Sequence, residues 1–148
     1  MSDYRPCILV FSTENVSDPG IDLAGRNKMH YPASVYVVSL PCSSAVKPRW
    51  IIRAIARGFD GVFIAADGSD CSYVPDCTRR TAAAVAAAQA QLKERSLEPA
   101  RVKMAAVCSV CAESFQKHMI SFSEALRKLG PSRRGPSGRA EALAVQGD

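Results

Sequence analysis

The sequence predicts an α/β fold in three layers, with a parallel sheet of four or five strands between two layers of helices. Apolar segments of strand length alternate about four times with segments of helix length along the 148 residues. Two of the strand candidates, residues 7–11 (CILVF) and 61–66 (GVFIAA), are short continuous apolar runs. Such runs are typical of parallel strands that are buried on both faces.

Each element has its own sequence signal. The expected strands cover residues 7–11, 35–40, 61–66 and 102–107, and the second of them, VYVVSL, is rich in β-branched residues. The expected helices cover residues 20–28, 48–57, 77–95 and 111–129. Pro48 suits a first helical turn, Asp76 suits an N-cap, and Gly130 suits a helix end. This alternation predicts a flavodoxin-like or Rossmann-like sheet with right-handed crossovers.

Length and composition restrict the organisation and the function classes. Residues 1–130 are expected to form one domain, and residues 131–148, rich in Gly, Pro, Ser and Arg, a flexible basic tail. The net charge of +5 is scattered and not interleaved with aromatic residues, so nucleic-acid binding is not indicated. No apolar run reaches the length of a membrane span, and the N-terminus has no signal-peptide pattern. The protein is therefore expected in the cytoplasm, with its six cysteines as thiols or metal ligands rather than structural disulfides.

Several cysteines follow strands, where the loops of a parallel sheet gather at one edge. Cys42 follows the second strand, Cys71 the third, and Cys108 and Cys111 form a C-x-x-C after the fourth, with Cys77 at the start of the helix nearby. These sulfurs could converge on a 2Fe-2S cluster, which needs four soft ligands. A single C-x-x-C is a weak signal, however, and buried cysteine is also common as a small apolar residue.

The loop after the first strand carries hydroxyl groups next to a helix start. Ser12, Thr13 and Ser17 could donate hydrogen bonds to an anion there, although two acidic residues in the same loop would repel phosphate. The alternative is ordinary capping, with Ser17 or Asp18 as N-cap and Pro19 at the first helical position. No G-x-G-x-x-G follows the first strand and no Walker A motif is present, so no motif supports nucleotide binding.

Residues 11–25, FSTENVSDPGIDLAG, resemble one family, the small iron–sulfur delta subunit of methyl-viologen-reducing hydrogenase, which partners heterodisulfide reductase. The family pattern is roughly F-C-C-x-x-C-x-x-x-G-x-D-L-A-G, and here Ser12, Thr13 and Val16 occupy the cysteine positions. The resemblance continues through HYP at residues 30–32, Cys42 with Ser43, GFDGV at residues 58–62, and D-C-x-Y at residues 70–73, and it covers about residues 4–129.

The resemblance implies a non-catalytic accessory subunit of an anaerobic multi-subunit oxidoreductase. Its implied partners are a hydrogenase or dehydrogenase and a heterodisulfide-reductase-like flavin subunit, with no nucleic acid and no membrane insertion. Only Cys42 and Cys71 remain at family cysteine positions, so the 2Fe-2S site is expected to be degenerate and without a cofactor. Two alternatives stay open. One is a working electron carrier with a cluster on Cys42, Cys71, Cys108 and Cys111, and the other is a phosphate- or nucleotide-binding regulatory domain.

Overall fold

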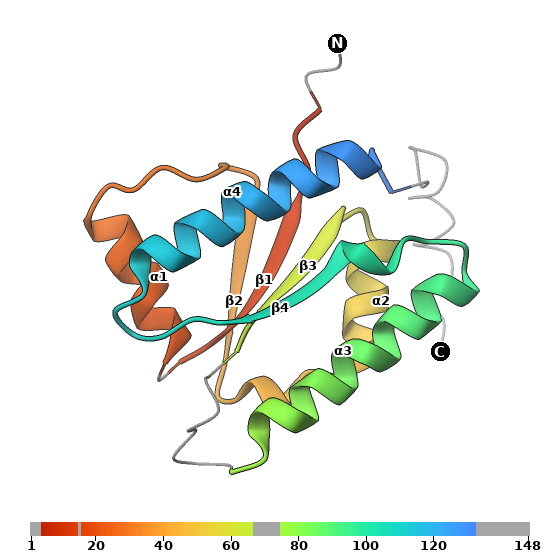
Figure 1. Ribbon diagram of the computed structural model, residues 1–148, viewed down its shortest axis with the longest axis horizontal. Helices are drawn as coiled ribbons and strands as arrows, with labels where there is room; N and C mark the ends of the chain where they lie inside the picture. Colours follow the sequence, from red (N-terminus) through yellow and green to blue (C-terminus); the bar gives the residue numbers. More distant parts are fainter. Residues whose placement is uncertain (1–3, 15, 67–74, 133–148) are drawn as a thin grey trace.

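The computed structural model describes residues 4–14, 16–66 and 75–132 and contains one parallel sheet. Its strands are β1 (Ile8–Thr13), β2 (Val35–Leu40), β3 (Gly61–Ala66) and β4 (Val102–Ala106), in the order β2-β1-β3-β4 (Figure 1). Every pairing is parallel. The order is that of the first four strands of a flavodoxin-like sheet, so the predicted fold class is confirmed.

Four helices connect and cover the strands. They are α1 (Ser17–Arg26), α2 (Pro48–Ala56), α3 (Cys77–Glu94) and α4 (Ala112–Leu129), with short 3-10 turns η1 (Ser43–Ala45) and η2 (Pro99–Arg101). Each predicted element is present. The first helix begins three residues earlier than predicted, and the first strand runs to Thr13 instead of Phe11. Among the described residues, no helix combines the length and apolarity that crossing a bilayer requires.

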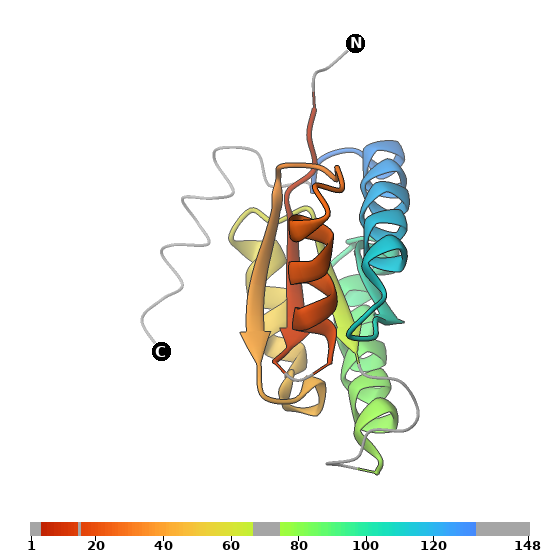
Figure 2. The ribbon, with the colours of Figure 1, turned by 90° about the vertical axis from the view of Figure 1, so that its left-hand side faces the viewer.

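Two apolar layers hold the helices on opposite faces of the sheet (Figures 1 and 2). On one face, Ile8 and Phe63 pack with Phe115 and Met119 of α4 and with the buried side of α1. On the other face, Ile64 packs with the buried sides of α2 and α3. Neighbouring strand residues such as Phe63 and Ile64 supply opposite layers because side chains alternate along a strand.

Helix α3 is rich in alanine, but few of its alanines contact the sheet. Its buried positions are Cys77, Thr81, Val85, Ala88 and Leu92, at the three- to four-residue spacing of one helix face. Most of the other alanines face outward. The expected packing of this helix on the sheet is therefore observed, but the larger residues between the alanines make the contact.

A buried arginine, Arg101, links several segments by hydrogen bonds at the edge of the sheet where the strands begin, called here the amino edge. The side chain of Arg101 is fully buried and donates hydrogen bonds to Glu98 Oε2 (2.7 Å), the Asp60 carbonyl (3.0 Å) and the Gly130 carbonyl (2.9 Å). The Asp60 carboxylate accepts hydrogen bonds from the backbone N–H groups of Cys7 (2.9 Å) and Ser132 (3.2 Å). Cys7, expected inside or just before the first strand, is half-buried immediately before β1, away from the carboxyl edge.

Candidate functional site

The hydroxyl groups at the end of β1 bond to the protein itself. Ser12 Oγ donates to Asp18 Oδ1 (3.1 Å), and Ser17 Oγ accepts from the Thr13 N–H (2.7 Å) and donates to the Ala65 carbonyl (2.9 Å). All three hydroxyl residues are buried. These hydroxyl groups are buried and already hydrogen-bonded within the protein, so they are not free to bind a phosphate. The loop therefore fits the expectation of local hydrogen bonding better than that of anion binding.

The start of α1 differs in detail from the predicted capping. The helix begins at Ser17 with Val16 at the N-cap position, and no side chain there accepts a capping hydrogen bond. The Ser17 N–H instead donates to Thr13 Oγ1 (3.1 Å), so a residue at the end of β1 satisfies one of the unpaired helix donors. The prediction of Ser17 or Asp18 as N-cap was therefore wrong.

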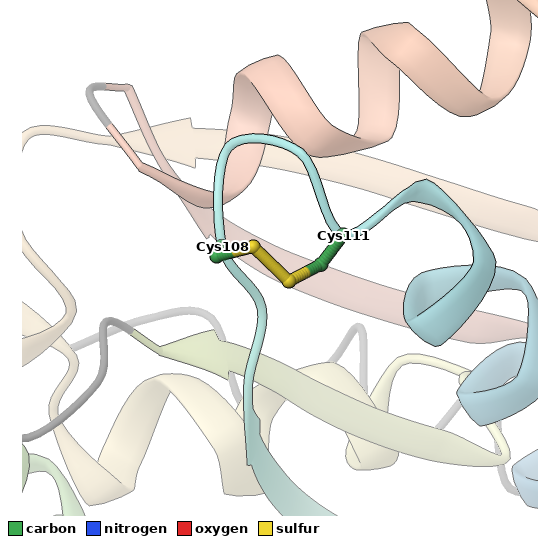
Figure 3. Close-up of a disulfide and its surroundings, with 2 residues drawn as sticks. All are labelled: Cys108 and Cys111. Carbon is green, nitrogen blue, oxygen red and sulfur yellow. A yellow bond between two sulfur atoms is a disulfide. The ribbon is translucent and has the colours of Figure 1, made fainter.

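The two sulfurs of the C-x-x-C after β4 are bonded to each other (Figure 3). The expectation of free thiols at Cys108 and Cys111 was wrong for this structure, and their role as ligands in the alternative cluster stays a prediction. The turn between them places their Cα atoms 4.9 Å apart, which lies within the range that a disulfide needs, and the Cys111 N–H donates to the Cys108 carbonyl (3.1 Å). While the two sulfurs share a bond, neither is a thiolate that could bind iron.

Helix α1 lies directly against this disulfide loop. A Cβ added to Gly20 would meet the Cys108 carbonyl oxygen at a separation that real Cβ atoms do not show. The same substitution at Gly25, about one and a half turns further along the helix, would meet nothing within 4 Å. Gly20 is therefore required for close contact between α1 and the loop, whereas Gly25 is not.

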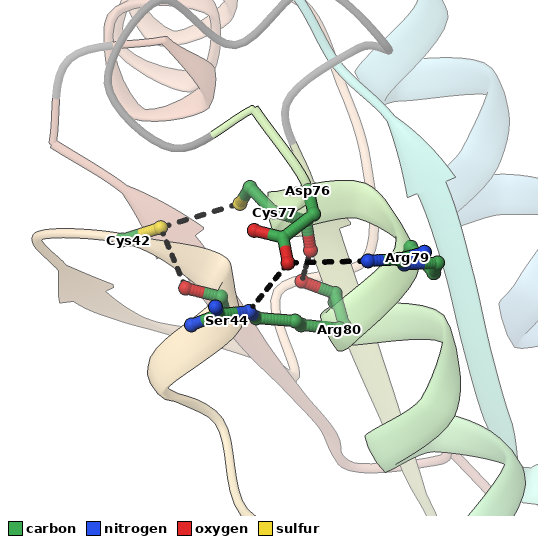
Figure 4. Close-up of polar contacts among 7 residues, drawn as sticks. Cys42, Ser44, Asp76, Cys77, Arg79 and Arg80 are labelled. Atoms are coloured by element: carbon green, nitrogen blue, oxygen red, sulfur yellow. Dashed lines mark hydrogen bonds and ion pairs between the residues drawn. The ribbon is translucent and has the colours of Figure 1, made fainter.

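A thiol pair lies at the carboxyl edge, between the loop after β2 and the first residue of α3 (Figure 4). Cys42 Sγ is 3.2 Å from Cys77 Sγ and 3.0 Å from Ser44 Oγ. Ser43 Oγ lies 3.3 Å from Cys77 Sγ and 3.0 Å from Thr81 Oγ1. Cys77, Ser43 and Thr81 are buried, and Cys42 is half-buried, so only one of the two sulfurs faces outward.

The surroundings affect the two thiols in opposite directions. Burial raises the pKa of Cys42 above its ordinary value, and the neighbouring Cys77 adds to this effect. Burial also opposes ionisation of Cys77, but hydrogen bonds from Ser43, Cys42 and the Ser44 backbone outweigh it and leave the pKa of Cys77 below its ordinary value. The position of Cys77 at the start of α3 favours its thiolate as well.

An ion-pair cluster adjoins this thiol pair on α3. The Asp76 carboxylate accepts from Arg80 Nε (2.9 Å) and Arg79 Nη2 (3.4 Å), and the hydrogen bond from Arg80 lowers the pKa of Asp76 (Figure 4). Asp76 occupies the predicted N-cap position, but its side chain makes no capping hydrogen bond. Its carboxylate is held by the two arginines instead.

The donor set in the described residues does not suit a cluster with four thiolates. Cys42 and Cys77 are the pair that the structure brings together, whereas Cys108 and Cys111 are bonded to each other and Cys7 lies at the amino edge. Within the described ranges, no three His, Cys, Asp or Glu side chains gather as metal ligands do. Cys71 lies outside the described residues, so the predicted ligand set that includes it stays a prediction.

Together, the flavodoxin-like strand order and this carboxyl edge define the class of protein. It is a small parallel α/β domain whose edge carries thiol and hydroxyl groups in place of a nucleotide-binding motif. The chain belongs to the family described as methyl-viologen-reducing hydrogenase, delta subunit, whose sequence profile matches residues 8–130. The resemblance proposed from the sequence is confirmed.

Three similar proteins show what this chain resembles. The iron-sulfur subunit of the F420-non-reducing hydrogenase of Archaeoglobus profundus is 29% identical over 130 residues, which are 87% of this chain and 94% of that protein. The iron-sulfur subunit of the F420-non-reducing hydrogenase vhu of Methanopyrus kandleri is 36% identical over 114 residues, covering 74% and 83%. One subunit of the ferredoxin:CoB-CoM heterodisulfide reductase of Methanosarcina mazei is 27% identical over 130 residues, which are 85% of this chain but 16% of that protein.

Proposed function

We propose that this chain is an accessory subunit of an electron-transfer complex of the hydrogenase and heterodisulfide-reductase kind, in which the scaffold is kept and the 2Fe-2S site is degenerate. Family membership supports the first part of this proposal, because similar proteins are named as subunits of such complexes. The hydroxyl network of Ser12, Thr13 and Ser17 is the observation that carries the second part.

Two of the residues in that network stand where the family pattern has cysteine. Ser12 and Thr13 are buried, and their polar atoms bond within the protein. An alkoxide is a much harder ligand than a thiolate, and Fe–S clusters are held mainly by thiolates. Since the C-x-x-C sulfurs are also bonded to each other, the described edge supplies only Cys42 and Cys77 as thiols.

The exposed edge of the sheet is the surface we propose for partner docking. β2 is an edge strand, and its residues Tyr36 (54% exposed), Val37 (38%) and Val38 (43%) present apolar side chains to solvent. Exposed apolar edge strands commonly mark protein contacts. The match to 16% of the heterodisulfide reductase chain shows that a domain of this kind occurs inside that larger protein, which favours a reductase chain of that type as the partner.

Co-purification tests the docking proposal. We expect the chain to form a stable complex with the homologue of that reductase chain from its own source organism under anaerobic conditions, as measured by size-exclusion chromatography. Val37→Lys should abolish the complex, since it places a charge in the centre of the β2 surface. Ile120→Lys is the matched control, because Ile120 is similarly exposed (41%) but lies on α4, and it should bind normally. Equal binding by both variants would refute the docking surface.

Iron analysis of the same anaerobic preparation tests the degenerate site. We expect protein without visible cluster absorption and without iron or acid-labile sulfide. A brown protein with iron and sulfide in equal amounts would contradict this proposal and favour the electron carrier with a rearranged cysteine set. The two tests are independent, because docking does not require the cluster.

A further inference from the structure

We propose that Cys42 and Cys77 form a reversible dithiol–disulfide pair that exchanges with small-molecule disulfides at the carboxyl edge of the sheet. This activity goes beyond the accessory role proposed above and does not depend on it. It rests on the contact between two sulfurs that come from separate elements and on the unequal exposure of those sulfurs.

The geometry already brings the two sulfurs close to bonding distance. Their separation is 3.2 Å, and a disulfide is about 2.05 Å long, so closure needs a movement of about 1 Å. Cys42 lies in the loop between β2 and η1, and Cys77 is the first residue of α3. Side-chain rotation at a loop residue and at a helix end can supply a movement of this size while the strands stay in place.

The two positions suit different steps of an exchange reaction. Cys42 is half-buried and can meet a solvent disulfide, whereas Cys77 is fully buried, and among the described residues the thiol that it contacts is Cys42. The hydroxyls of Ser43 and Ser44 lie within hydrogen-bonding distance of the sulfurs, and the surroundings favour the thiolate at Cys77 over that at Cys42. Exposure therefore assigns the attack on a solvent disulfide to Cys42, and the favoured thiolate of the buried Cys77 suits the second, resolving step.

The reaction balances in two exchange steps. Cys42 Sγ attacks one sulfur of a disulfide R–S–S–R, forms the mixed disulfide Cys42–S–S–R and releases one R–S–H, which carries the proton of Cys42. Cys77 Sγ then attacks Cys42 Sγ, displaces the second R–S–H with the proton of Cys77, and closes the Cys42–Cys77 disulfide. The protein dithiol loses two electrons and the small disulfide gains them, so no further oxidant is needed.

The experiment uses the full chain and bis(2-hydroxyethyl) disulfide as the probe. After incubation, acid quenching and alkylation of the remaining thiols, peptide mapping by mass spectrometry identifies the sulfur that each cysteine carries. We expect wild type to show a Cys42–Cys77 cross-link with no retained hydroxyethyl group. Cys77→Ser should lose the cross-link and retain the hydroxyethyl adduct on Cys42, because the resolving thiol is gone. Cys42→Ser should leave Cys77 unmodified, because it is buried.

Cys7→Ser is the matched control, since it removes a cysteine from the opposite edge, and it should form the cross-link as wild type does. Cys77→Ala repeats the test without a hydroxyl group, and circular dichroism verifies that each variant is folded. A persistent adduct on Cys42 in wild type would overturn the proposal, and so would a cross-link from Cys42 to Cys71. The assay contains no partner and no iron, so its failure would leave the proposed accessory function untouched.

Discussion

The contact between α1 and the disulfide loop can be tested with two glycine substitutions in one helix. Gly20→Ala places a methyl group against the Cys108 carbonyl oxygen, whereas Gly25→Ala places the same group in open space. Both changes gain helix propensity of at most about 1 kcal/mol, less near the helix end where Gly25 lies. The difference between the variants therefore reports mainly the cost of the contact.

That cost follows from how firmly the carbonyl is held. Cys108 O accepts the turn hydrogen bond from the Cys111 N–H, and the disulfide bridges the same turn. Overpacking against atoms that cannot move away costs about 1–3 kcal/mol, and loss of the turn hydrogen bond adds about 1 kcal/mol. We expect Gly20→Ala to unfold with a free energy about 1–3 kcal/mol lower than wild type, and Gly25→Ala to match wild type or exceed it by up to about 1 kcal/mol.

Urea unfolding followed by circular dichroism, with the disulfide kept oxidised, measures both free energies. A double-mutant cycle then tests the cause. In a background where Cys108 and Cys111 are both serine, the loop is released, and Gly20→Ala should cost less than in wild type. Equal stability of the Gly20 and Gly25 variants would refute the close packing of α1 on this loop.

Three further perturbations have defined outcomes. Oxidation of Cys42 and Cys77, which are 35 residues apart, should raise the free energy of unfolding by about 3–4 kcal/mol, because the disulfide restricts the unfolded chain. A urea titration of oxidised wild type against oxidised Cys77→Ser measures this gain. Arg101→Met should lower the free energy of unfolding by about 2–4 kcal/mol, since it leaves buried carbonyl groups unpaired, and no loss in the same titration would contradict the buried network. Burial, with a smaller contribution from Lys103, lowers the pKa of His118 below its unfolded value of about 6.5. The free energy of unfolding should therefore fall as pH decreases through about 6.5, because the unfolded state then binds the proton more readily. His118→Gln should weaken this pH dependence of the urea midpoint.

The fold was predictable because its signals are local. Continuous apolar runs identify β1 and β3, and the alternation with helical segments determines the parallel class. The exact start of α1 was not predictable in the same way. It depends on Thr13, which belongs to the preceding strand yet accepts the hydrogen bond from the Ser17 N–H. A cap supplied from outside the helix leaves no pattern at the expected position.

The sequence indicated the edge of the sheet at which Cys42 and Cys77 lie, but not that their two sulfurs would be in contact. Cys42 and Cys77 could be assigned to one edge, because each follows a strand of a parallel sheet. Their contact depends on the turn of η1 and on the buried hydroxyls beneath it, which sequence spacing does not determine. The thiol expectation for Cys108 and Cys111 came from the predicted compartment, whereas the local turn already brings their Cα atoms within disulfide range.

The apolar core of this fold is separate from the residues at two of the family cysteine positions. The apolar layers consist of side chains of the strands and of the inner faces of the helices, whereas Ser12 and Thr13, at two of the family cysteine positions, lie at the end of β1. Ser12 and Thr13 can replace cysteine there because Asp18 and Ser17 offer them hydrogen bonds, so the substitution costs the core little. The match over residues 8–130 identifies the family and does not by itself assign the chemistry. The chemistry depends on where the remaining sulfurs lie. At the carboxyl edge, the four described cysteines lie in two pairs, Cys42 with Cys77 and Cys108 with Cys111. Pairs of sulfurs suit two-electron thiol–disulfide exchange better than the binding of a cluster by four thiolates.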